Sequence, residues 1–187
     1  MILTDREILI GIERGLITID PRPKDHAFSS TSVDLTLDSA LTEFKATKGG
    51  IETVIDPDHD EFSSEIVLAE LTNSFQMPAD GYLLRPGPLV LGWTAEAVDL
   101  KTDARIAGRV EGKSSLARLG LAIHVTAPTI HSGFKGRIRL EMVNHGPIPV
   151  RLRAGMRICQ LIFEATLGTP ERGYRGQFFG QSAPPPT

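Results

Sequence analysis

The sequence predicts a mainly β fold, a sandwich or barrel, with one short helix at its N-terminus. The 18 glycines and 13 prolines among 187 residues indicate many turns between short elements. Several segments alternate apolar and polar residues, with the period of two that a half-buried strand requires. No long helical pattern follows residue 15. The length fits a single domain spanning residues 1–187.

The N-terminal helix is expected between Thr4 and Gly15. Thr4 and Glu7 have the spacing of a capping box, and Gly15 is typical of the residue just past a helix C-terminus. Ile8 and Ile12 then share the face that packs on the core.

The first strand is predicted in SSTSVDLTLD, where apolar residues alternate with polar ones at Val33, Leu35 and Leu37. Asp34 lies on the polar side of this strand. It could belong to a site, although a surface or salt-bridged aspartate is the more frequent case.

Residues 45–65 are polar and rich in turn-forming residues, so we expect a loop or lid there, with a short strand over Ile51–Ile55. Short strands follow from Glu65, with turns at 78–81 and 86–88, and LVLGWTAEAVDL is apolar enough for a buried strand. The H-x-E pattern at His59–Glu61 also occurs in zinc deaminases, which need P-C-x-x-C as well. One cysteine, Cys159, cannot supply that motif or form an internal disulfide.

Charge is divided unevenly along the chain. Residues 1–100 contain 7 Lys and Arg against 18 Asp and Glu, a net −11, and residues 101–187 contain 13 against 5, a net +8. The basic half favours an anionic ligand, attraction to the acidic half, or simply solubility. Nucleic acid is disfavoured because no series of aromatic residues accompanies the basic ones. No apolar run reaches the length of a membrane span, so a cytoplasmic protein is expected.

Most polar residues that could carry chemistry lie between Gly108 and Glu141. The segment GKSSLAR combines a flexible glycine with hydroxyl and cationic groups suited to phosphate, namely Lys113, Ser114, Ser115 and Arg118. It lacks the glycine spacing of a Walker loop, and an ordinary surface loop can have the same residues.

Acid–base candidates follow this segment. His124 and Thr126 interrupt the apolar IHVTAPTI, and His131 precedes a glycine turn, although structural histidines are common at such places. In RIRLEMV the apolar residues share one face, and the other face carries Arg137, Arg139 and Glu141. Glu141 is therefore either ion-paired with an arginine or a proton-transfer group with a tuned pKa.

The C-terminal segment, residues 171–187, is rich in glycine and ends in a run of prolines. It is either a frayed terminus or an arm that orders over a ligand. Its polar residues Tyr174, Arg175 and Gln177 favour the arm.

The combination of GKSSLARLGLAIHVTA with GFKGRIRLE closely resembles the dCTP deaminase branch of the dUTPase superfamily. The segments MILTDREILIGIERGLITIDPRP, SVDLTL and YRGQ extend the resemblance over nearly the whole chain, and residues 40–65 match least. The family implies a distorted jelly roll, a β-barrel-like dUTPase fold, in homotrimers with active sites at subunit interfaces. It implies zinc-independent hydrolysis of dCTP to dUTP and ammonia. Mg²⁺ would bind with the nucleotide triphosphate and be held mainly by it.

The resemblance also assigns roles by position. Glu141 would be the general base and acid, taking a proton from water and delivering it to cytosine N3 and the leaving amine. Ser114 and the carbonyl of Ala127 would hold the attacking water, and Arg118 would stabilise charge near the base. The substrate-binding residues would be Lys113, Ser115, His124, Val125, Thr126, His131, Tyr174, Arg175 and Gln177.

Three positions depart from the family pattern. Lys113 replaces an arginine and loses its bidentate fork. His131 replaces an aspartate that meets the sugar 3′-hydroxyl and, in dUTP diphosphatases, positions the hydrolytic water. Gly173 replaces a lysine before the tyrosine of the arm. Two alternatives therefore stay open: a dUTP diphosphatase or bifunctional enzyme giving dUMP, and a non-catalytic nucleotide-binding trimer.

Overall fold

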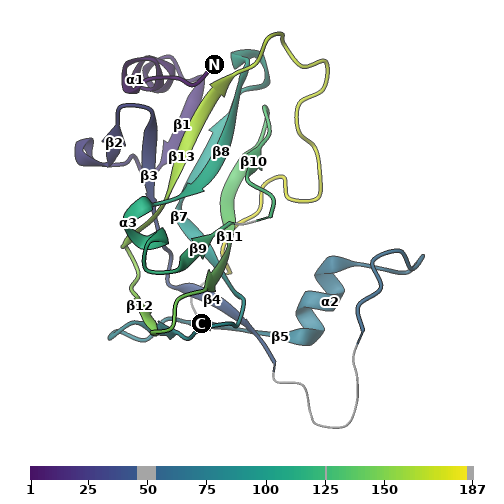
Figure 1. Cartoon of the computed structure of the whole chain (residues 1–187). Coiled ribbons are helices and arrows are strands. Elements are labelled where there is room, and N and C mark those ends of the chain that lie inside the picture. The colour runs from purple at the N-terminus through teal and green to yellow at the C-terminus, as the bar shows by residue number, and fades with distance from the viewer. Residues whose placement is uncertain (46–53, 125, 185–187) are drawn as a thin grey trace.

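The computed structural model describes residues 1–45, 54–124 and 126–184, and most of its regular structure is β-strand, as predicted (Figure 1). The first sheet has the order β5-β4-β7-β11-β9, and β1 pairs with a second stretch of β7. Its strands are β1 (Ile17–Asp20), β4 (Ala40–Phe44), β5 (Thr72–Gln76), β7 (Val90–Leu100), β9 (Leu121–Ile123) and β11 (Lys135–Asn144).

The second sheet has the order β10-β8-β13-β3-β2. It consists of β2 (Phe28–Ser29), β3 (Ser32–Thr36), β8 (Ile106–Gly112), β10 (Thr129–Ile130) and β13 (Arg157–Ala165). A two-stranded sheet joins β6 (Tyr82–Leu84) to β12 (Val150–Leu152). Every strand pair in the three sheets is antiparallel, as in other folds built from short strands and tight turns.

One core forms between the two large sheets. It contains the predicted apolar faces of β3 and β11, together with residues of β7, β8 and β13; the largest of these include Leu35, Leu140, Met142 and Phe163. Burying such side chains stabilises the fold by about 2 kcal/mol each. The strand predictions for 33–37, 89–100 and 138–142 are thus confirmed.

The predicted N-terminal helix is present as α1 (Asp5–Glu13). The capping box between Thr4 and Glu7 forms as expected. Gly15 follows the helix with φ of +69°, a left-handed conformation that a residue with a Cβ rarely adopts. No described helix is long and apolar enough to cross a membrane.

The region after residue 45 departs from the prediction. A helix, α2 (Ser64–Leu71), stands where short strands were expected from Glu65 (Figure 1). Ser63 caps it by accepting a hydrogen bond from the Ile66 N–H at 3.4 Å. The run EIVLAEL is dominated by strong helix formers, whose propensity outweighs the strand-like apolar run. Of the short strand predicted over Ile51–Ile55, residues 51–53 lie outside the described residues, and Val54 and Ile55 are not in a strand.

Three further short elements lie between the strands. The segment GKSSLAR, the candidate for phosphate binding, contains α3 (Ser114–Ala117), directly after β8. Single-turn 3₁₀ segments, η1 (Asp25–Ala27) and η2 (Thr102–Ala104), complete the fold. Figure 1 shows α2 standing off to one side of the sheets and α3 on the side near β9.

Candidate functional site

Glu141 projects from the outer face of β11, opposite the core. Along this strand Ile138, Leu140 and Met142 are buried, while Arg139 and Glu141 alternate with them. Pairing of β11 with β7 sets Glu141 beside Leu91 and Arg139 beside Trp93. The outer face therefore carries a carboxylate and a guanidinium over an apolar floor.

Arg139 is tied into that floor. Its guanidinium lies 4.6 Å from the centre of the Trp93 ring, within the range of a cation–π contact. Its Nη2 donates to Thr42 Oγ1 at 2.9 Å, and that hydroxyl lies 2.9 Å from Ser74 Oγ. Burial lowers the pKa of the guanidinium. A polar chain thus runs across β11, β4 and β5 beneath the cavity.

A cavity of about 470 Å³ covers this floor. Its walls come from α2, from residues 124 and 127–134 between β9 and β11, and from residues 174–181 of the C-terminal arm. Predicted site residues that line it are His124, Ala127, His131, Glu141, Tyr174 and Gln177. Its apolar lining includes Phe44, Leu68, Leu91, Trp93, Phe134 and Ile138. The volume and mixed lining suit a small organic ligand such as a nucleoside.

Glu141 has a defined local partner. Its carboxylate accepts a hydrogen bond from Thr126 Oγ1 at 2.7 Å, and its backbone carbonyl accepts one from the His124 N–H at 2.9 Å. Among the described residues it makes no ion pair with an arginine. The carboxylate therefore remains able to exchange a proton with a molecule in the cavity.

His124 is buried beside Glu141 in an unusual backbone conformation. Its φ is +56°, in the left-handed region, and its Nδ1 is buried without a hydrogen-bond partner in the described structure. Burial lowers the pKa of its imidazole; the Glu141 carboxylate and the carbonyls of Ala127 and Arg139 oppose this shift only in part. A neutral imidazole therefore lies next to the carboxylate at neutral pH.

This burial predicts a pH-dependent stability. Because the pKa of His124 is lower in the folded protein than in the unfolded chain, the unfolded chain takes up the proton first below about pH 6.5, and the free energy of unfolding falls as pH falls. His124→Asn removes the titrating group and tolerates positive φ. The free energy of unfolding, measured with denaturant, should fall between pH 7.5 and pH 5.5 in the wild type. This fall should exceed the fall in the variant by up to about 1.4 kcal/mol. Equal losses would contradict a buried neutral imidazole, and His145→Asn, in an exposed turn, is the matched control.

The arm contacts the turn before β11 and the start of α2. Tyr174 N–H donates to the Ser132 carbonyl at 3.0 Å, and the Tyr174 ring stacks on His131. Gln177 Nε2 donates to Ser64 Oγ at 3.2 Å, at the start of α2. Arg175 lines a neighbouring cleft of about 300 Å³ that also contains Lys135. The described part of the arm thus packs on the domain.

The phosphate-binding candidates lie elsewhere. Ser114, Ser115 and Arg118 are exposed on and just after α3, and none of them lines the Glu141 cavity. The ammonium of Lys113 is paired with Asp34, which also accepts from Arg157 Nη1 at 3.1 Å. Asp34 is therefore a salt-bridged aspartate, the more frequent of the two cases considered from the sequence. Val125 lies outside the described residues.

Several cavity residues were not predicted as site residues, and among them Trp93, Arg139 and Gln181 carry polar groups. Arg139 shares the face of Glu141, and the alternation of RIRLEMV already placed it there. Trp93 and Gln181 reach the cavity through strand pairing and the path of the arm, which no local pattern in the sequence encodes.

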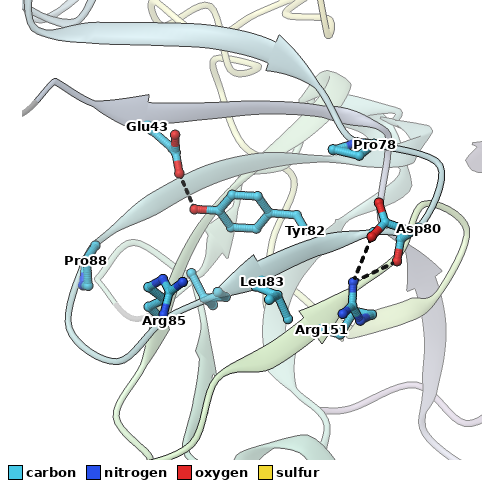
Figure 2. Close-up of a pocket in the computed structure, with 10 residues that line it drawn as sticks. Glu43, Pro78, Asp80, Tyr82, Leu83, Arg85, Pro88 and Arg151 are labelled. Atoms are coloured by element: carbon cyan, nitrogen blue, oxygen red, sulfur yellow. Dashed lines mark hydrogen bonds and ion pairs between the residues drawn. The ribbon is translucent and has the colours of Figure 1, made fainter.

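A second cavity of about 490 Å³ adjoins β6 (Figure 2). The Tyr82 hydroxyl donates to the Glu43 carboxylate, and Arg151 Nη1 donates to the Asp80 carboxylate at 3.3 Å. Burial raises the pKa of the Tyr82 phenol, and the hydrogen bond to Glu43 raises it further. Because these groups pair with one another, we assign them to holding β6 against its neighbours.

No group of three or more His, Cys, Asp or Glu side chains is placed to hold a metal ion in the described parts of the chain. The polar side chains on and beside α3 are hydroxyls and cations, namely Lys113, Ser114, Ser115 and Arg118. Such groups suit phosphate oxygens.

The family model for dCTP deaminase-like proteins matches residues 2–166. A dCTP deaminase of Rhodospirillum rubrum is 37% identical over 180 residues, covering 93% of this chain and 87% of the relative. A dUMP-forming dCTP deaminase of Methanosphaera stadtmanae is 36% identical over 189 residues, covering 98% and 91%.

Solved structures support the fold alone. A 2′-deoxycytidine 5′-triphosphate deaminase from Agrobacterium tumefaciens superposes with a TM-score of 0.67 at 20% identity over 88% of this chain. This chain spans 48% of the length of that one. A dUTPase of Staphylococcus bacteriophage 80alpha matches with a TM-score of 0.50 at 11% identity, covering 86% of this chain and 96% of the dUTPase. The predicted dUTPase-like β fold is thus confirmed.

Proposed function

Since this chain belongs to the dCTP deaminase-like family, we propose that it removes the C4 amino group of dCTP by hydrolysis and releases dUTP and ammonia. The observation that carries the proposal is the position of Glu141, on the floor of a cavity of nucleoside size and beside the buried side chain of His124. Relatives named dCTP deaminase support the reaction class.

Hydrolysis at C4 needs a base for water and an acid for the leaving amine, and one carboxylate can serve as both in turn. Glu141 takes a proton from water as the oxygen attacks C4, and delivers it to N3. A second proton then moves from the new hydroxyl to the amine, the C4–N4 bond breaks, and ammonia leaves. Thr126, which donates to the carboxylate at 2.7 Å, orients it. Ala127 lies in the cavity wall, and its carbonyl would accept a hydrogen bond from the water.

We propose that each active site is completed by a second copy of the chain. Ser114, Ser115 and Arg118 are exposed and outside the Glu141 cavity. The cavity of a single chain therefore lacks these groups, which would bind the nucleotide. Leu119, which follows Arg118 directly, is 61% exposed, and Ile148 between β11 and β12 is 72% exposed, which suits burial between subunits. A closed ring of copies, a homotrimer, would bring α3 of one subunit to the cavity of the next.

In the completed site Ser114 would help hold the attacking water and Arg118 would stabilise charge near the base. Ser115, with Lys113 if it releases Asp34, would contact phosphate, joined by Arg175 and Gln177 of the arm. Mg²⁺ would arrive with the triphosphate and neutralise part of its charge, while the hydroxyls and cations of the protein bind the remaining oxygens. No zinc is used in this scheme.

The second candidate is a bifunctional reaction that continues to dUMP and pyrophosphate. This bifunctional reaction is favoured by a relative at 36% identity that is named a dUMP-forming dCTP deaminase. His131 disfavours it, because an imidazole stacked on Tyr174 replaces the carboxylate that positions the hydrolytic water in diphosphatases. A third possibility, a nucleotide-binding trimer without catalysis, is motivated by Lys113 and His131.

Chromatography of the products decides among these functions. Incubation with dCTP and Mg²⁺ is expected to give dUTP and ammonia in equal amounts, with no pyrophosphate. Formation of dUMP and pyrophosphate from dCTP would establish the bifunctional reaction, and dUMP from added dUTP alone a diphosphatase. Unchanged dCTP, despite a nucleotide-dependent change in the fluorescence of the single tryptophan, Trp93, would indicate a binding protein.

A further inference from the structure

His131 is in contact with the C-terminal arm. It precedes the turn before β11, and its ring stacks on Tyr174 with centroids 5.4 Å apart and planes inclined by 11°. Phe134, at the other end of the same turn, also contacts the Tyr174 ring, at 6.0 Å and inclined by 45°. One face of the imidazole is therefore occupied by the arm.

The backbone at this contact is equally close. Tyr174 N–H donates to the Ser132 carbonyl at 3.0 Å. Gly133 has φ of +86°, and a Cβ there would lie 2.8 Å from the Tyr174 nitrogen. A Cβ on Gly173 would collide with the Thr102 hydroxyl. Both glycines thus allow the turn and the arm to approach more closely than residues with side chains would.

Tyr174 also fixes the position of the residues that follow it in the arm. Its hydroxyl accepts from the Phe178 N–H at 3.3 Å. Further along, Gly180 N–H donates to the Lys135 carbonyl at 2.7 Å, and Gln181 exchanges hydrogen bonds of 2.8 and 2.9 Å with the Arg137 backbone. Tyr174, Gln177, Phe178 and Gln181 all line the Glu141 cavity. Holding Tyr174 therefore shapes one wall of the cavity.

We propose that His131 is a positioning residue for the arm: its imidazole stacks on Tyr174 and holds the arm closed over the Glu141 cavity before any nucleotide binds. It acts through the ring face and not as a hydrogen-bonding ligand of the sugar. The effect on the nucleotide rests on the proposed function, whereas the effect on the arm does not.

Limited digestion with trypsin tests the proposal on the full chain without nucleotide. Arg172 and Arg175 flank Tyr174 and are exposed, so cleavage there reports the open population of the arm. His131→Ala is expected to raise the cleavage rate at these sites about 2- to 10-fold, the range that loss of one aromatic pair produces. His131→Phe keeps the stack and should be cleaved at the wild-type rate, as should the control His145→Ala.

Two results would overturn the proposal: an unchanged cleavage rate in His131→Ala, or equally fast cleavage in His131→Phe. Cleavage at Arg139, within the paired strand β11, shows whether a variant has unfolded as a whole. If His131→Ala does not fold, Tyr174→Leu removes the same stack from the opposite side and is expected to give the same increase.

Kinetics with dCTP separate arm positioning from contact with the sugar. His131→Ala should raise KM about 2- to 10-fold with little change in kcat, and His131→Phe should restore KM, because only the ring face is needed. Equal impairment of the two variants would show that the imidazole contacts the nucleotide and would refute the proposal. If the wild type does not turn over dCTP, the proposed function fails and the digestion result still decides the role of His131.

Discussion

Glu141→Gln is expected to lower kcat for dCTP deamination by about 10³-fold or more, because one carboxylate serves as both base and acid and an amide can do neither. Glutamine has the same shape, and its carbonyl oxygen can still accept the hydrogen bond that Thr126 donates at 2.7 Å. Binding should therefore survive: the dissociation constant for dCTP, followed through Trp93 fluorescence, is expected to stay within about threefold of wild type.

The matched control for this variant is Glu164→Gln. Glu164 lies on β13, where it pairs with Arg109 at 3.2 Å, and it does not line the cavity. The Glu164→Gln variant loses the same charge as Glu141→Gln and should deaminate dCTP at the wild-type rate. Ammonia release by Glu141→Gln within about tenfold of wild type would remove Glu141 from the proton-transfer role. Loss of binding along with turnover would instead assign the carboxylate to holding the ligand.

Mixing two inactive variants is expected to restore activity if sites form between subunits. Arg118→Ala alone should lose about 10²-fold or more in kcat through the missing charge stabilisation. When Arg118→Ala and Glu141→Gln chains are refolded together in equal amounts, about one quarter of the sites in a ring combine an intact Arg118 with an intact Glu141 from its neighbour. Activity near that fraction of wild type is expected for the whole mixture, and about one third for trimers that contain both chains.

The control mixture combines Glu141→Gln with Glu141→Ala, which cannot complement in any arrangement. Particles that contain both chains are isolated through two different affinity tags, so that a failure to mix is recognised before activity is read. Persistent inactivity of the isolated mixed particles would show that both residues act within one chain. A monomeric mass in solution would exclude the shared site as well.

Several features of the fold follow from local patterns in the sequence. The alternation in RIRLEMV determined which residues of β11 enter the core and which face outward, because the side-chain period of a strand is fixed at two. The capping box of Thr4 and Glu7 set the start of α1. By contrast, the apolar run after Ser63 was compatible with strand or helix, and the prediction of strands there was wrong.

Local patterns in the sequence predicted only part of the candidate site. The sequence placed the chemically useful groups between Lys113 and Glu141, and the resemblance to a family gave them roles. The structure separates these groups into a cavity around Glu141 and an exposed set on and beside α3. Proximity along the chain does not fix proximity in space when a strand and a turn intervene.

By itself, then, the sequence determined the fold class, the faces of the main strands and the segment that carries the polar residues. Only the tertiary structure decided that Arg139 stacks on Trp93, that His124 is buried beside Glu141, and that His131 meets Tyr174. The physical reason is that local periodicity records which way a side chain points, whereas strand register and the path of the arm decide what it meets.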